Sequence, residues 1–170
     1  PMRTIKGRKG FFRQPMPEQH IDPVPAGLAE KYFDRVAFPE DADFAKVFIE
    51  SPLSDGYSSE DRAQGGNGYM PISLQYRPYK ADTAREESIG GGDFREGFTN
   101  RGYKGKVGTA ANEADLDLVL DTKAAMGDKP VVVCLRMHNP TVVAELEATA
   151  DAILVDFGVQ AQAIFDLVSG

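Results

Sequence analysis

The sequence has little of three things: cysteine, positive charge and long apolar runs. Of its 170 residues one is cysteine, and 19 lysines and arginines stand against 26 aspartates and glutamates, for a formal charge of −7. A single cysteine excludes a disulfide within the chain. The acidic balance argues against a general nucleic-acid binder, because phosphates are met by cations. No apolar run approaches the ~20 residues that span a bilayer, so we expect no membrane span.

What is present has the composition of a globular domain. Apolar residues make up 42% and charged residues 26% of the chain, which is neither fibrous nor wholly disordered. Cys134 lies within the longest apolar run, Pro130 to Leu135, and we interpret it as a thiol of the core. The chain opens with Pro1-Met2-Arg3 and without the layout of a signal peptide. We therefore expect a piece of a longer protein.

The first 25 residues differ from the rest. They combine a cluster of cations with five prolines and few periodic apolar positions. This pattern predicts an irregular, solvated segment at 1–25, followed by one domain at 26–170. No aromatic or amphipathic pattern accompanies the basic charge, so a surface loop is favoured over a contact with nucleic acid or a membrane.

Apolar runs and helical periods alternate through most of the remaining chain. Helices are predicted at 27–38, 112–127, from 139 onward and at 161–168, and strands at 44–50, 130–135 and 152–155. Asn112 and Asn139 are the expected caps of two of these helices. Continuous apolar strands that alternate with helices predict parallel pairing. The expected fold is α/β: a three-layer αβα sandwich with a mostly parallel sheet of flavodoxin-like topology.

Residues 51–111 form a long insertion in this pattern. Eleven of the 17 glycines and five of the six tyrosines fall here, and no long helical period survives. A connection of this length is usually functional or disordered. Its aromatic residues argue for order, because they bury large areas. We predict an ordered functional loop with a short strand near Pro71–Leu74.

The place where this loop begins indicates a site. In open parallel sheets, ligands bind beyond the carboxyl ends of the strands, and the loop follows the strand at 44–50. A carboxylate that loses solvent there can act as a general acid, and tyrosines suit sugars. A solvated surface cluster is the alternative for residues 60–62. The candidates are Glu50, Asp55, Tyr57, Glu60, Asp61 and Arg62.

Other chemistries fit less well. The glycine clusters at 65–68 and 90–92 lack the Lys-Ser/Thr of a phosphate-binding loop, which weakens a flavodoxin-like nucleotide binder. His20 and His138 lie far apart without a spaced His or Cys partner, so we expect no metal site and no cofactor. His138 is interpreted as a loop residue at the sheet edge. No Gly-x-Ser-x-Gly elbow is present, and Cys134 lies in mid-strand, which argues against a serine or cysteine nucleophile.

Several segments resemble a known family. They read Lys-Pro-Val-Val-Val-Cys-Leu at 129–135, Asn-Pro at 139–140, Ala-Asp-Ala-Ile-Leu-Val at 150–155 and Ala-Ile-Phe-Asp-Leu-Val-Ser-Gly at 163–170, with Gly158 between the last two. Phe-Ala-Lys-Val-Phe-Ile-Glu-Ser-Pro-Leu-Ser-Asp at 44–55 is similar to the family's strand and its Gly-Glu-x-Pro-x-x-Glu loop. Together they resemble the second domain of family 3 glycoside hydrolases, the β-glucosidase-like enzymes, over roughly residues 42–170 with a long insertion.

This resemblance implies an αβα sandwich packed against a separate (β/α)₈ barrel. In the family the barrel carries the aspartate nucleophile, and the sandwich loop often carries the acid/base carboxylate of a retaining reaction on terminal β-linked sugars. The two carboxyl groups of such enzymes lie ~5–5.5 Å apart. Matching the motif places Asp55 where relatives carry the acid/base glutamate, with Glu60 as the second candidate. Tyr57, Arg62 and Glu50 are the expected substrate-binding residues, and the family suggests a periplasmic or secreted location.

The chain also departs from the family pattern. Asp55 is one methylene shorter than glutamate, and His138-Asn139-Pro140 stands where the family has Gly-Arg-Pro. Without a barrel, this chain alone is expected to be inactive. The alternative function is a non-catalytic sandwich that binds carbohydrate or a partner through the tyrosine-rich loop.

Overall fold

A computed structural model describes residues 3–5, 19–90 and 93–170. The chain divides into two compact units, one formed by 1–43 with 158–170 and the other by 44–157. The larger unit holds a three-stranded sheet of β3 (Ala45–Glu50), β6 (Val131–Arg136) and β7 (Ala152–Asp156), in the order β3-β6-β7. Both pairings are parallel, with Val47 opposite Val133 and Val133 opposite Ile153. The predicted α/β class and parallel pairing are therefore confirmed.

The central strand β6 explains why these apolar runs become strands. Val131, Val133, Cys134 and Leu135 are all buried, because a central parallel strand is covered on both faces. Val47 and Ile49 of β3 join them in the core. Each such side chain contributes about 1.5–3 kcal/mol by leaving water, so a polar substitution in β6 removes much of the sheet's stability.

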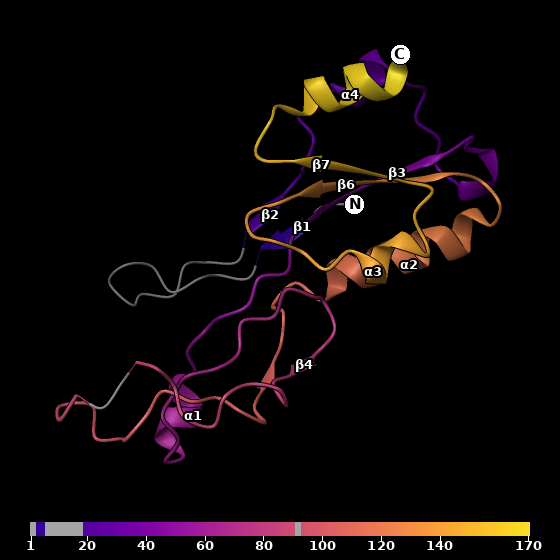
Figure 1. The fold of residues 1–170 in the computed structure, drawn as a ribbon. Helices are drawn as coiled ribbons and strands as arrows, with labels where there is room; N and C mark the ends of the chain where they lie inside the picture. The colour runs from indigo at the N-terminus through magenta and orange to yellow at the C-terminus, as the bar shows by residue number, and fades with distance from the viewer. Residues whose placement is uncertain (1–2, 6–18, 91–92) are drawn as a thin grey trace. The chain divides into compact units, whose positions relative to one another are not determined.

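Two helices lie on one face of this sheet (Figure 1). They are α2 (Ala114–Met126) and α3 (Ala144–Glu147). Leu116 and Val119 of α2 and Leu146 of α3 are buried against the strands. Helix α2 ends at Gly127, whose φ of +60° lies in the left-handed region that glycine adopts without strain.

Three sequence-based predictions of helices were wrong in detail. Residues 27–38 form only the 3-10 turn η1 (Ala29–Lys31), and η2 (Pro39–Asp41) follows it. The helix expected from Asn139 begins only at Ala144, and the side chain of Asn139 binds elsewhere. Asn112 does not cap α2 either, since the residue before the helix is Glu113 and no side chain caps it. In both cases the asparagine side chain instead forms hydrogen bonds with the backbone of residues 52–53, far away in sequence.

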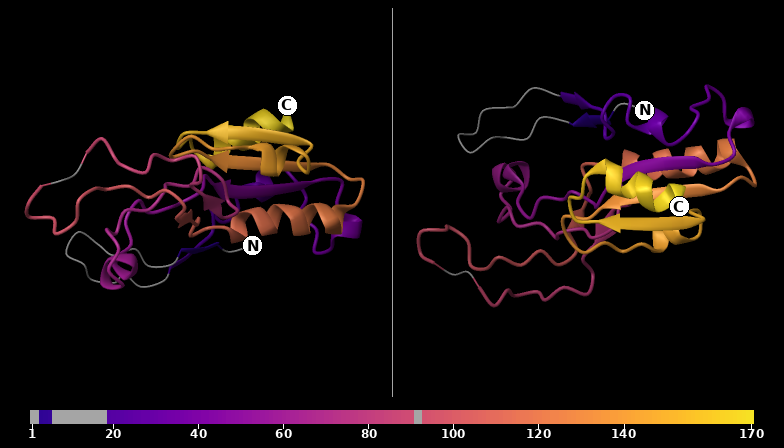
Figure 2. Two further views of the ribbon diagram at one scale, coloured as in Figure 1. Left: turned by 60° about the horizontal axis from the view of Figure 1, so that its bottom comes forward. Right: turned by 90° about the horizontal axis from the view of Figure 1, so that it is seen from above.

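The long insertion at 51–111 leaves the sheet and returns as an excursion with few regular elements (Figure 2). It contains α1 (Ser59–Ala63) and an antiparallel pair of β4 (Tyr79–Lys80) with β5 (Val107–Gly108). The strand expected at Pro71–Leu74 is not formed, because Ser73 bonds to the side chain of Ser54 and Leu74 bonds to Val142, so no continuous backbone pairing develops. The fold of the excursion thus rests on side-chain hydrogen bonds and turns.

The smaller unit holds β1 (Arg3–Ile5) paired antiparallel with β2 (Gln19–Ile21), and α4 (Ala161–Ser169). The two strands lie within the segment for which no regular structure was expected, and most of that basic segment, 1–2 and 6–18, lies outside the described residues. Phe165 of α4 packs its ring 5.6 Å from Tyr32 and 5.9 Å from Phe33. The Tyr32 hydroxyl donates to Asp166 at 2.6 Å. The helix predicted at 161–168 is confirmed.

Candidate functional site

The excursion departs from the sheet at a buried, well-bonded corner. Ser51 follows β3 directly and is fully buried. Its hydroxyl donates to Asn139 Oδ1 at 3.1 Å and accepts the backbone N–H of His138 at 3.0 Å. The Asn139 amide also donates to the carbonyl of Pro52 at 3.3 Å. The carboxyl ends of β3 and β6 are thereby joined by side chains, which fixes the direction in which the chain leaves the sheet.

Asn112 holds the other end of the excursion against the same corner. Its Oδ1 accepts the N–H of Leu53 at 2.7 Å, and its amide donates to the carbonyls of Glu50 and Ser51 at 3.1 and 3.2 Å. The same amide donates to Asp115 Oδ2 at 2.9 Å, and Asp115 accepts the N–H of Glu50 at 3.1 Å. The first and last residues of the excursion are thus clamped together at the carboxyl end of β3.

Asp55 lies just beyond this clamp, between two residues that are hydrogen-bonded to another segment of the excursion. The flanking residues bond to the segment at 70–73: Ser54 Oγ accepts from Ser73 N–H at 2.9 Å, and Gly56 O accepts from Met70 N–H at 3.0 Å. The Asp55 side chain is exposed, and within the described residues its carboxylate has no hydrogen bond or ion pair. The backbone of Asp55 is therefore held while its carboxylate remains free to meet a ligand.

Glu60 sits on the short helix α1, whose first turn is capped by the Ser58 hydroxyl accepting from Asp61 N–H at 3.1 Å. The Glu60 side chain is exposed and accepts a long hydrogen bond of 3.4 Å from Gln64. It therefore lies on a solvated helical surface, whereas the two neighbours of Asp55 are hydrogen-bonded to residues 70–73.

Asp61 is bonded to two other residues of the excursion. Its Oδ2 accepts from Lys106 Nζ at 2.7 Å and from the backbone N–H of Gly68 at 2.8 Å. These two donors, the ammonium first, hold the pKa of the Asp61 carboxyl below its usual value. Lys106 also donates to Asn67, whose amide donates to the carbonyls of Asn100 and Gly102. Asp61 thus organises the excursion and is not free for acid/base chemistry.

Tyr57 and Arg62 are also placed by contacts within the excursion. The Tyr57 ring lies edge-on to Tyr69 at 5.8 Å, although 51% of Tyr57 remains exposed. Arg62 donates to the carbonyls of Gly66 and Glu96 at 3.1 and 3.0 Å, and its guanidinium lies 5.1 Å from the ring centre of Phe98. Arg62 therefore joins two segments of the excursion, a role that the sequence did not indicate.

Glu50 ends β3 beside charged groups of the neighbouring strands. Its Oε2 lies 3.7 Å from His138 Nε2, and its register partner Arg136 contacts Asp156 at 3.3 Å. Among the described residues, no hydrogen bond or ion pair joins any two of the five candidates Glu50, Asp55, Tyr57, Glu60 and Arg62. The expected interpretation of His138 as a residue at the sheet edge agrees with its position.

Sequence reasoning missed the residues that shape this region most. Tyr76 is fully buried, and its hydroxyl donates to the carbonyl of Glu50 at 2.6 Å. The carboxylate of Glu145 accepts the N–H groups of Tyr76 and Arg77 at 2.7 and 3.0 Å. Arg77 in turn pairs with Glu113 and Asp117 of the α2 region. The only sequence signal was an unusually high share of tyrosine in the excursion.

A cavity of about 600 Å³ opens next to the segments that contain Gly56 and Met70. Its lining is aromatic and aliphatic, with Gly56 as the residue nearest to Asp55 in sequence. The lining residues are Gly56, Tyr69, Met70, Pro71, Ile72, Leu74, Gln75, Tyr79, Thr83, Ala84, Tyr103 and Val142. A volume of this size is typical of small-molecule sites.

Two negative findings bear on the chemistry. In the part of the chain that the structure covers, no group of three or more His, Cys, Asp or Glu side chains is placed to hold a metal ion. No helix among the same residues is long and apolar enough to cross a membrane.

Comparison of the chain with models of protein families, with curated proteins and with solved structures found no match in any of the three.

Proposed function

We propose that this chain is the sandwich domain of a retaining β-glycosidase that acts on terminal β-linked sugars. In this proposal it contributes the acid/base loop to an active site shared with a (β/α)₈ barrel of the parent protein, which carries the nucleophile. The completed domain is a three-layer αβα sandwich of flavodoxin-like topology. Support comes from the parallel order β3-β6-β7, from α2 and α3 on one face, and from the motifs that resemble family 3.

The observation that carries the proposal is the placement of Asp55. Its carboxylate is exposed, its two neighbours in sequence are hydrogen-bonded to residues 70–73, and it follows the carboxyl end of a parallel strand. Ligands of open α/β sheets bind at that end. Glu60 is the weaker candidate for the acid/base role, because it lies on the solvated surface of a five-residue helix.

The proposed reaction has two steps. In the first, the Asp55 carboxyl gives its proton to the glycosidic oxygen while the bond from that oxygen to the anomeric carbon breaks. The barrel carboxylate forms an ester with the same carbon, and the alcohol departs. In the second, the Asp55 carboxylate takes a proton from water as the water oxygen displaces the ester, which regenerates both groups.

The split between two domains has a physical reason. A general acid works best when its pKa lies near the working pH, which for a carboxyl requires loss of solvent. Asp55 is exposed in this chain, so a covering surface has to supply that desolvation. In the proposal the barrel is this surface.

The test uses the parent protein and two aryl β-glucosides, 2,4-dinitrophenyl and 4-methoxyphenyl, with good and poor leaving groups. Asp55→Asn is expected to lower kcat/KM for the poor leaving group by about 10²–10⁴-fold, because protonation of the leaving oxygen is lost. The substrate with the good leaving group needs little protonation, so its kcat/KM falls far less, although its turnover is slowed in the second step, which also uses Asp55. Azide, a nucleophile that needs no general base, is expected to restore turnover of the good substrate as a glycosyl azide.

The matched control is Glu60→Gln, which also neutralises one carboxylate of the excursion and is expected to leave both substrates unaffected. If Glu60→Gln lowers kcat/KM for the poor leaving group and Asp55→Asn does not, the acid/base role belongs to Glu60. The 170-residue chain alone is expected to show no turnover, since the nucleophile lies in the barrel. Turnover by this chain alone, or a parent protein without any glycosidase activity, would refute the proposal and favour a non-catalytic binding domain.

A further inference from the structure

We propose that the cavity of the excursion is a binding site for a neutral pyranose, and that this chain binds it without a barrel. The inference goes beyond the proposed function, because it rests on the lining of the cavity and not on any catalytic group. Three of the twelve lining residues are tyrosines, namely Tyr69, Tyr79 and Tyr103. Aromatic faces pack against the C–H face of a sugar ring, while hydroxyls bond its hydroxyl groups.

The walls of the cavity are held by bonds outside it. On one side, Leu74 O accepts the N–H of Val142 at 2.8 Å, and the next residues are bonded to Glu145. On the other side, Tyr79 pairs with Gly108 in the β4–β5 ladder, and Ala81 exchanges backbone hydrogen bonds of 3.0 Å with Lys106 and Gly105. A site whose walls are already ordered loses less entropy when a ligand binds.

Tyr69 is fixed in the same way. Its ring meets the rings of Tyr57 and Phe98 edge-on at 5.8 and 6.0 Å, and the guanidinium of Arg101 lies 5.3 Å from its centre. Arg101 itself is paired with Glu96. Tyr69 is thus a rigid wall, and the positive charge behind it is neutralised.

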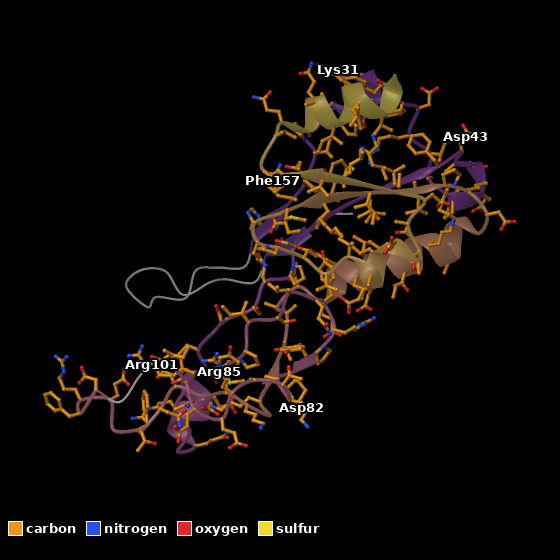
Figure 3. The ribbon with its side chains drawn as sticks, viewed as in Figure 1. Lys31, Asp43, Asp82, Arg85, Arg101 and Phe157 are labelled. Atoms are coloured by element: carbon orange, nitrogen blue, oxygen red, sulfur yellow. The ribbon has the colours of Figure 1, made fainter. Side chains whose placement is uncertain are left out.

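The lining carries no ionisable acid or base of the Asp, Glu, Lys, Arg or His type. Asp82 and Arg85, which flank the lining pair Thr83–Ala84 and are labelled in Figure 3, are not part of it. Asp82 is paired with Lys80 at 3.0 Å. A charged ligand such as a uronic acid finds no counter-charge in this lining, so the site favours neutral sugars.

The polar groups in the lining are neutral, and the tyrosine hydroxyls among them are available to a ligand. Within the described chain, the hydroxyls of Tyr69, Tyr79 and Tyr103 have no hydrogen-bond partner. The amide nitrogen of Gln75 is used by the carbonyls of Arg77 and Pro78 at 3.3 and 3.4 Å. A sugar can pack its C–H groups against the apolar wall and hydrogen-bond its hydroxyls to the tyrosine hydroxyls. A purely aromatic ligand would leave these hydroxyls without a partner.

The test measures binding to the 170-residue chain by NMR, with ¹³C labels on the methionine methyl groups. The chain has five methionines, and Met70 is the one that lines the cavity. The probes are cellobiose, glucuronic acid and benzyl alcohol. Cellobiose is expected to shift the Met70 signal in a saturable manner, with a Kd in the range of ~0.1–10 mM. Glucuronic acid and benzyl alcohol are expected to bind at least about tenfold more weakly, for lack of a counter-charge and of hydroxyls.

Tyr103→Ala and Tyr79→Ala are each expected to weaken cellobiose binding about tenfold or more. Tyr103→Phe keeps the ring and its packing, so it folds as the parent does, and it is expected to lose several-fold through the missing hydroxyl. The matched control is Phe94→Ala, which removes an aromatic side chain of the excursion that is 92% exposed and outside the cavity. It is expected to change nothing.

The inference would be overturned by a Met70 signal that does not respond to ~50 mM cellobiose, or by a Phe94→Ala variant that loses as much cellobiose affinity as Tyr103→Phe. It would also be overturned if glucuronic acid bound as tightly as cellobiose, or if benzyl alcohol bound more tightly than cellobiose. A Met70 shift on dilution without sugar would show that a second copy covers the cavity, and would also overturn it. Because no turnover is measured, failure here leaves the glycosidase proposal standing, and failure of that proposal leaves this one standing.

Discussion

Asn112→Asp tests whether the clamp at the base of the excursion works as described. The amide nitrogen of Asn112 faces three oxygens, the carbonyls of Glu50 and Ser51 and the carboxylate of Asp115 at 2.9 Å. The substitution keeps the acceptor for the N–H of Leu53 but replaces the donor with a carboxylate oxygen. The three acceptors then face a negative charge instead of a donor.

The magnitude follows from these contacts. The amide has two hydrogens, so the three contacts count as two full bonds, one to a carbonyl worth about 1 kcal/mol and one to the carboxylate worth about 1.5–3 kcal/mol. Repulsion between the two carboxylates adds to this loss, although solvent screens it because the site is only partly buried. We expect the free energy of unfolding at pH 8 to fall by about 3–5 kcal/mol.

The sign of the pH dependence is the sharper test. Asp115 and the two carbonyl oxygens disfavour ionisation of the introduced carboxyl, so they raise its pKa in the folded state above the unfolded value of about 3.9. The electrostatic penalty is absent below the unfolded pKa and grows as the pH rises through the folded pKa. The deficit of Asn112→Asp relative to the parent is therefore expected to widen between pH 4 and pH 8.

The assay is urea unfolding followed by circular dichroism at several pH values. Asn112→Ala removes the amide donor and also the acceptor for the N–H of Leu53, without adding a charge, and its deficit is expected to be about 3–5 kcal/mol at every pH. Gln64→Glu makes the same amide-to-acid change at an exposed position of the excursion and is expected to have little effect. A deficit of Asn112→Asp that is constant with pH, or that shrinks as pH rises, would contradict the assigned donation to Asp115.

Three further predictions follow from other contacts. Lys106 and the N–H of Gly68 lower the pKa of Asp61, so the ionised Asp61 stabilises the fold above the unfolded pKa of about 3.9, and this stabilisation is lost as the pH falls through the lower folded pKa. In urea unfolding, Asp61→Asn is expected to abolish this loss of stability at acid pH, whereas Glu60→Gln is expected to retain it. Gly68→Ala is expected to cost about 1–2 kcal/mol from its φ of +83° alone, and more because the added Cβ overlaps the Tyr57 ring; equal melting temperatures of variant and parent would contradict this. Burial raises the pKa of Cys134 to about 11, so a disulfide reagent at pH 8 is expected to label the native chain far more slowly than the urea-unfolded chain, and equal rates would show that the thiol is accessible.

The sheet was predictable because its signal is local. Val131 to Leu135 is an unbroken apolar run, and a central parallel strand requires that pattern since both of its faces are covered. The strand that ends at Glu50 and the strand from Ala152 were found in the same way. The position of the candidate site also followed from the strands, because the carboxyl ends of parallel strands lie at one edge.

The two asparagines show where such reasoning stops. Asn112 and Asn139 both precede helical patterns, and an asparagine there is a sound prediction of a cap. In the fold each binds a segment far away in sequence, Leu53 and Ser51. A side-chain amide bonds to whichever polar group is nearest in space, and the spacing of residues in the sequence does not indicate which group that is.

The sequence by itself determined the α/β class, the parallel strands, the helix after Asn112 and the order of the chain, because burial of apolar surface repeats with the period of the backbone. Only the tertiary structure decided the course of residues 51–111, the clamp at Asn112, the role of Asp61 and the tyrosine-lined cavity. These depend on hydrogen bonds and ring contacts between residues tens of positions apart. Such contacts exist only once the sheet has brought the two ends of the excursion together.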